Sequence, residues 1–165
     1  MVFHQVLPQA FSRFLSVFLL VFLGFSGTAL AEKPEIYLSS GGVFSSGWEF
    51  ALDGYDTVAY FTEGKPVKGD PAYKTVFKGV TWIFANQKNL DSFLDDPDRY
   101  RPQYGGYCAY AVAQGTTAKG DPEQWYIEDG KLYLNLNPKI LKRWVGQKAE
   151  YIEAADNNWP KVIND

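Results

Sequence analysis

The sequence predicts an α+β domain in which a small antiparallel sheet, made of two hairpins, packs against helices. The clearer hairpin spans residues 125–136, where strand-forming runs flank Asp129-Gly130, the pair favoured in a type I′ turn. A second hairpin is predicted over 73–84 around Lys78-Gly79, because apolar residues alternate along its second strand. Helix signals follow each hairpin, which gives the mixed class.

The helices are predicted from their capping residues. Asn86 can cap a helix that ends at Asp96-Pro97, because proline cannot continue a helix. Asn137-Pro138 opens another helix, which is expected to end at Gly146, and a last helix is expected around 151–155. These signals predict helices on the C-terminal side of both hairpins.

The rest of the chain is divided by composition. Residues 1–31 form an apolar leader, 32–52 a Gly- and Ser-rich irregular arm, and 53–165 one domain. Within that domain, Val58, Tyr60 and Phe61 suggest a short strand. The sequence shows no internal repeat and no second domain.

The leader predicts export from the cytoplasm. Arg13 is its one charged residue, and residues 14–31 are uncharged. Ala29-Leu30-Ala31 supplies the small residues of a signal-peptidase site, which predicts cleavage before Glu32. The alternative is an uncleaved anchor, because an uncharged segment of this length reaches the lower limit for crossing a bilayer. We expect a mature protein that is periplasmic or secreted and free of the membrane after cleavage.

Composition excludes several function classes. Without Arg13 the chain has 15 basic residues against 19 acidic ones, so nucleic acid is a poor partner. The one histidine, His4, lies in the leader, and Cys108 is the single cysteine. Histidine-based catalysis and internal disulfides are therefore excluded from the mature chain, and the aromatic-rich composition is mostly core material.

The single cysteine lies in a tyrosine- and glycine-rich segment that is the candidate site. Two glycines precede it and allow close backbone approach. A helix over 109–113 would begin at Cys108, and its free N–H groups would lower the pKa of the thiol. The predicted ligand-binding residues are Tyr104, Gly105, Gly106, Tyr107, Cys108 and Tyr110.

Three roles for Cys108 stay open at this stage. It is a buried small side chain, a ligand of a soft metal ion such as copper, or a reactive thiol. A disulfide-linked dimer through Cys108 is a further option. The exposure and the pKa of the thiol distinguish these roles.

Residues 56–59 and 82–100 resemble the YHS domain, a small module found in copper-transporting ATPases, in some multicomponent monooxygenases and alone in exported bacterial proteins. The runs 104–109 and 131–135 are similar to the exported, stand-alone branch. In metal-handling relatives, cysteines occupy the positions of Ala59, Ala85 and Asn89. Since these side chains are poor ligands for soft metals, the resemblance implies the scaffold without its usual thiolate site.

The sequence therefore favours an exported, non-enzymatic binding module that takes up a small ligand, a metal ion or a protein near Cys108. One alternative is a redox or covalent-thiol protein that acts through Cys108. Another is a structural or interaction domain in which Cys108 is buried.

Overall fold

The computed structural model describes residues 33, 35–38 and 50–164. The chain divides into two units, Met1–Leu30 and Ala31–Asp165, and all described residues belong to the second. The expected leader and most of the expected arm therefore lie outside the described residues. Among the described residues, no helix has the length and apolar character needed to cross a membrane.

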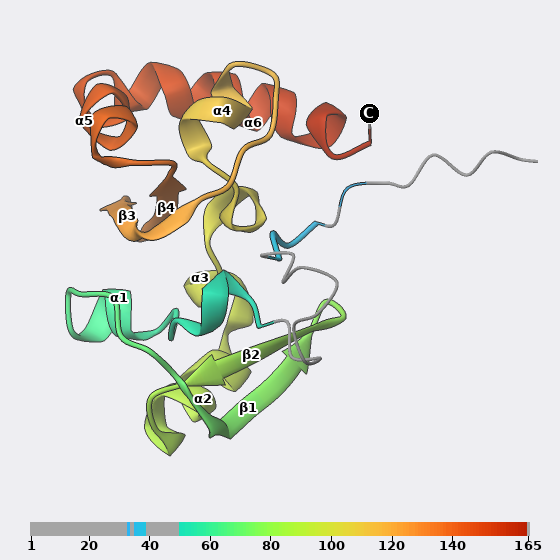
Figure 1. Cartoon of the computed structure of the whole chain (residues 1–165), viewed down its shortest axis with the longest axis vertical. Coiled ribbons are helices and arrows are strands. Elements are labelled where there is room, and N and C mark those ends of the chain that lie inside the picture. Colours follow the sequence, from blue (N-terminus) through green and yellow to red (C-terminus); the bar gives the residue numbers. More distant parts are fainter. Residues whose placement is uncertain (1–32, 34, 39–49, 165) are drawn as a thin grey trace, which may run out of the picture. The chain divides into compact units, whose positions relative to one another are not determined.

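The first half of the domain is a hairpin followed by helices, and Figure 1 shows α2 beside this hairpin. Positive φ angles at Lys78 (51°) and Gly79 (74°) close the predicted tight turn. The Asn86 side chain accepts a hydrogen bond of 2.9 Å from the N–H of Asn89, which is the predicted N-cap. The elements are α1 (Ala59–Thr62), β1 (Asp70–Phe77), β2 (Val80–Phe84), α2 (Gln87–Asp95) and α3 (Pro97–Tyr100).

The second half of the domain is also a hairpin followed by helices, and the last of these helices is the longer one. Asp129 and Gly130 have φ angles of 50° and 70°, and Asn137 caps its helix by accepting from Ile140 N–H at 3.0 Å. Helix α5 packs on the hairpin, and α6 packs on α4. The elements are α4 (Ala109–Ala113), β3 (Asp121–Glu128), β4 (Lys131–Asn135), α5 (Pro138–Gly146) and α6 (Lys148–Val162).

These elements confirm the predicted α+β class, and two details differ from the expectation. The two hairpins form separate two-stranded antiparallel sheets. Val58, Tyr60 and Phe61, expected in a short strand, lie at or within α1. Their apolar character reflects burial in the core, because Val58 and Tyr60 are almost completely buried. Burial on all sides removes the periodicity that distinguishes a short helix from a strand.

The second half repeats the first after 51 residues. β1 begins at Asp70 and β3 at Asp121, and the strand pairing is irregular just after each of these residues. The starts and ends of β2 and α2 are displaced by the same number of positions in β4 and α5. The expectation that the chain has no internal repeat is therefore corrected. One hairpin-and-helix unit occurs twice.

The cores of the two repeats are also related. In the first, the rings of Trp82 and Phe93 lie 5.2 Å apart between centroids. In the second, the rings of Tyr133 and Trp144, each 51 positions later, lie 5.0 Å apart. The shared aromatic pair holds each helix against its hairpin.

Candidate functional site

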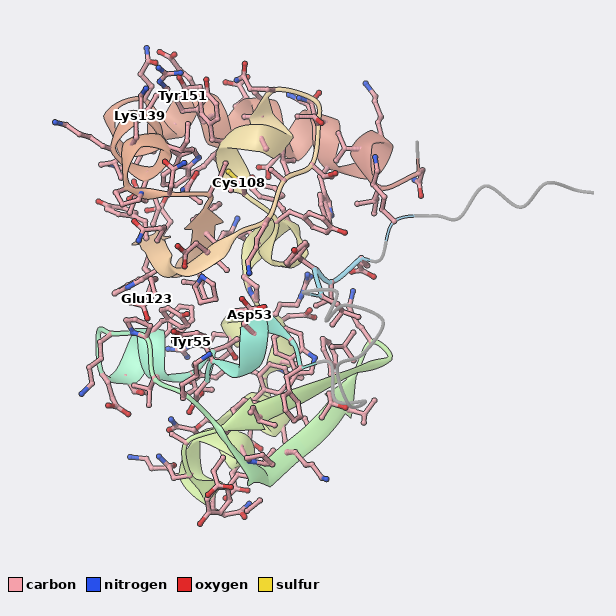
Figure 2. The ribbon with its side chains drawn as sticks, in the orientation of Figure 1. Asp53, Tyr55, Cys108, Glu123, Lys139 and Tyr151 are labelled. Atoms are coloured by element: carbon pink, nitrogen blue, oxygen red, sulfur yellow. The ribbon has the colours of Figure 1, made fainter. Side chains whose placement is uncertain are left out.

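Cys108 lies in the core, at the residue before α4. Only 1% of it is exposed, and its N–H donates to the carbonyl of Ala118 at 2.9 Å. It forms an isolated parallel bridge with Leu134 of β4. Figure 2 shows its sulfur inside the second half of the domain. The main chain of Cys108 is therefore held on two sides.

The surroundings of the sulfur are polar although they are buried. The thiol donates to Asn135 Oδ1 at 3.8 Å, and the same oxygen accepts from the N–H of Tyr110 at 3.2 Å. Burial raises the pKa of Cys108, and backbone N–H groups of Ala111, Leu136 and Tyr110 act against that rise. The expectation of a lowered pKa is wrong, because α4 has only five residues and desolvation outweighs its N–H groups.

The neighbouring tyrosines and glycines pack inside the domain. The Tyr104 hydroxyl donates to Asp156 Oδ1 at 2.8 Å, and the Tyr107 ring packs edge-on against Tyr37 at 5.2 Å. A Cβ on Gly105, where φ is 60°, would lie 1.7 Å from the carbonyl oxygen of Glu35. Glycine at position 105 therefore leaves the space that the backbone of Glu35 occupies. Four of the six predicted residues, Tyr104 to Tyr107, are packing residues in this structure.

Tyr110 is the member of the predicted set that reaches the surface. It is half-buried, and its ring packs edge-on against Tyr151 of α6 at 5.1 Å. Its hydroxyl accepts a hydrogen bond from Nη1 of Arg143, on α5, at 3.1 Å. We call Tyr110, Arg143 and Tyr151 the Tyr110 patch.

Burial also bears on the metal and dimer predictions for Cys108. Among residues 33, 35–38 and 50–164, no three His, Cys, Asp or Glu side chains lie close enough to hold a metal ion together. A copper ion at Cys108 stays a prediction. The disulfide-linked dimer also stays a prediction, and because Cys108 is buried in the core it would require local unfolding to bring two sulfur atoms together.

Asp56 forms a second buried polar centre, in the first repeat. Its Oδ1 caps α1, accepting from the N–H groups of Val58 at 2.8 Å and Ala59 at 3.3 Å. Its Oδ2 also accepts from the N–H of Ala85 at 2.8 Å and from Nδ2 of Asn89 at 2.7 Å. The side chain is completely buried. One carboxylate thus joins α1, the end of β2 and α2.

Cys108 occupies the place of Asp56 in the second repeat. The N–H of Asp56 donates to Val67 at 2.8 Å, as that of Cys108 donates to Ala118 at 2.9 Å. The N–H groups around the two side chains correspond as well, since Tyr110, Ala111 and Leu136 follow Val58, Ala59 and Ala85 by 52, 52 and 51 positions. A cage of corresponding N–H groups therefore binds a carboxylate in one repeat and lies around a thiol in the other, where the N–H of Tyr110 donates to Asn135 Oδ1.

The sequence carried a signal for this correspondence. Gly-Asp-Pro occurs at 69–71 and again at 120–122, before both hairpins. Each hairpin turn has glycine as its second residue, and each following helix has asparagine as its N-cap. All three features recur at the same spacing of 51 residues, although few other residues match.

Comparison with known protein families finds a match in the first repeat. The family model of the YHS domain matches residues 58–104, from the start of α1 to the turn before Cys108. Comparison with curated proteins and with solved structures gives no match. The matched segment contains the whole first hairpin with α2 and α3, the scaffold implied by the sequence resemblance. The chain therefore contains one segment, residues 58–104, that matches the YHS domain.

Proposed function

We propose that this protein is an exported, non-enzymatic binding module that contacts a protein partner through the Tyr110 patch. The supporting observation is that Tyr110 is the predicted binding residue that reaches the surface, where it meets an arginine and a second tyrosine. Tyrosine and arginine are enriched among residues that dominate binding energy at protein interfaces. Both tyrosine rings are already fixed by their mutual packing, so little side-chain entropy is lost on binding.

The charge of this surface favours an acidic partner. Arg143 is exposed, and its hydrogen bond to Tyr110 raises the pKa of the guanidinium further. Lys139 and Lys142 of the same helix are also exposed. Cations on one helix of an acidic chain give a local field opposite to the net charge. We therefore propose carboxylate-rich protein surface as the partner chemistry.

A crosslinking experiment tests this surface. A photoreactive amino acid replaces Lys139 in the full chain, and in a control chain it replaces Lys88, the equivalent exposed residue of α2. We expect discrete adducts in the compartment outside the cytoplasm from position 139, reduced at least several-fold by adding R143E or by raising the salt concentration. Equal adducts from both positions, or adducts unchanged by R143E, would contradict the proposal.

The export part has a separate measurement. Intact mass analysis of the protein released by a Gram-negative host is expected to show a chain beginning at Glu32, because the leader has the pattern that signal peptidase recognises. Recovery of the chain with Met1 in the membrane fraction would show a retained anchor.

A further inference from the structure

We propose that Cys108 is a modification site at which a peroxide oxidises the thiol to a sulfinate, and that the second repeat holds this sulfinate as the first repeat holds the Asp56 carboxylate. This inference is independent of the binding surface proposed above. It follows from the correspondence between the two repeats and from an unpartnered buried amide beside the sulfur.

The shapes of the two groups correspond. In aspartate, the carboxyl carbon follows Cβ and carries two oxygens. In cysteine sulfinate, Sγ follows Cβ and also carries two oxygens and one negative charge. The sulfur of Cys108 thus stands where the carboxyl carbon of Asp56 stands in the first repeat. Its added oxygens would be directed at the N–H groups of Ala111 and Leu136, the counterparts of the Ala59 and Ala85 N–H groups that bind Asp56.

Asn135 supplies the observation that points to an added acceptor. It is completely buried on β4, and its Oδ1 is engaged by Cys108 and Tyr110, which fixes the orientation of the amide. Its Nδ2 is buried and has no hydrogen-bond partner. Buried amide donors are nearly always satisfied in folded proteins. A sulfinate oxygen would accept from Nδ2, as Oδ2 of Asp56 accepts from Nδ2 of Asn89.

The two repeats differ at two neighbouring positions, the one occupied by Asp56 or Cys108 and the one occupied by Phe84 or Asn135. The residue of the first repeat that corresponds to Asn135 is Phe84, which is also completely buried. Where the first repeat pairs a carboxylate with an apolar ring, the second pairs a thiol with a polar amide. The second repeat thus has a buried amide at position 135 but no buried carboxylate. The negative charge of a sulfinate at Cys108 would give this amide an anionic acceptor.

The chemistry needs hydrogen peroxide or an organic hydroperoxide as oxidant. The thiol sulfur attacks one peroxide oxygen as its proton leaves, an S–O bond forms, the O–O bond breaks, and the leaving oxygen takes up that proton as water or alcohol. The product is a sulfenic acid, and sulfur has lost two electrons to the peroxide. A second peroxide oxidises the sulfenic acid in the same way, and the resulting sulfinic acid releases its proton to become the anion.

The first test is peroxide treatment of the folded full chain, read by mass spectrometry of the peptide that contains Cys108. We expect this peptide to gain two oxygen atoms and to stop there, while the protein keeps its melting temperature or gains a few degrees. The chain unfolded in urea is expected to go on to three oxygen atoms, because the cage is lost. A native thiol that resists oxidation, or a doubly oxidised protein that unfolds, would overturn the proposal.

The second test replaces the modification by a permanent charge. C108D is expected to fold with a melting temperature within a few degrees of the parent chain, whereas A109D, an equally buried neighbour outside the cage, is expected to unfold. Adding N135L to C108D should lower the melting temperature by more than N135L lowers it in the parent chain. In C108D the Asn135 amide donates to the introduced carboxylate, and the parent chain lacks this hydrogen bond. Equal damage from C108D and A109D, or no such coupling, would show that the cage does not accept an anion.

Discussion

The variant D56A is expected to lose ~4 kcal/mol of unfolding free energy, because several buried donors lose their acceptor at about 1–3 kcal/mol each before relaxation. The carboxylate accepts from three backbone N–H groups and from the Asn89 amide. Alanine leaves the donors of Val58, Ala59 and Asn89 without an acceptor in the core, and that of Ala85 at its partly buried edge. Urea unfolding followed by tryptophan fluorescence measures the loss, since Trp82 lies in the core cluster that also contains Val58, whose N–H donates to Asp56.

A second aspartate provides the control. Asp70 is exposed and accepts one hydrogen bond, from the N–H of Ala72 at 2.8 Å. We expect D70A to cost less than ~1 kcal/mol, because water replaces the lost acceptor. If D56A and D70A had similar effects, the buried carboxylate would not be the junction of α1, β2 and α2 that its contacts indicate.

The variant G120A is also expected to be strongly damaging, with a loss of ~3 kcal/mol or more from forced backbone movement. A Cβ at this position would lie 2.1 Å from the carbonyl oxygen of Gly106 and 2.9 Å from Cβ of Leu134. Backbone cannot move aside as a flexible side chain can. Because Leu134 is the bridge partner of Cys108, the strain would act on the candidate site itself.

The matched control is G146A. This glycine ends α5, and a Cβ added to it would meet no atom within 4 Å, so alanine fits. We expect G146A to be neutral or to stabilise the protein by about 0.5–1 kcal/mol, the usual gain from restricting the unfolded chain. Melting curves of the two variants separate steric conflict from general intolerance of substitution, and equal effects would refute the close-approach explanation.

Local features were predictable because they depend on residues close together in the chain. The turns at Lys78-Gly79 and Asp129-Gly130 need only positive φ at adjacent residues. The asparagine caps of α2 and α5 need only an acceptor three residues before a free N–H. The α+β class followed from these signals, and the YHS resemblance implied the scaffold of the first repeat, which the family match at residues 58–104 supports.

The burial of the candidate site was not predictable in the same way. The two glycines beside Cys108 are equally compatible with a ligand or with packed chain, and the segment around Glu35 is what approaches Gly105. The pKa of the thiol depends on the balance between desolvation and nearby N–H groups. That balance is set by residues packed around the sulfur from elsewhere in the chain, and the sequence pattern around Cys108 does not contain it.

By itself, then, the sequence determined the two hairpins, the capped helices that follow them, the family resemblance and the single thiol. Tertiary structure alone decided that the thiol is buried and that it stands in the place of Asp56. The physical reason is distance along the chain. The Asp56 carboxylate is completed by Ala85 and Asn89, and Cys108 by Asn135, 27 residues away. Such contacts exist only after the hairpins have packed.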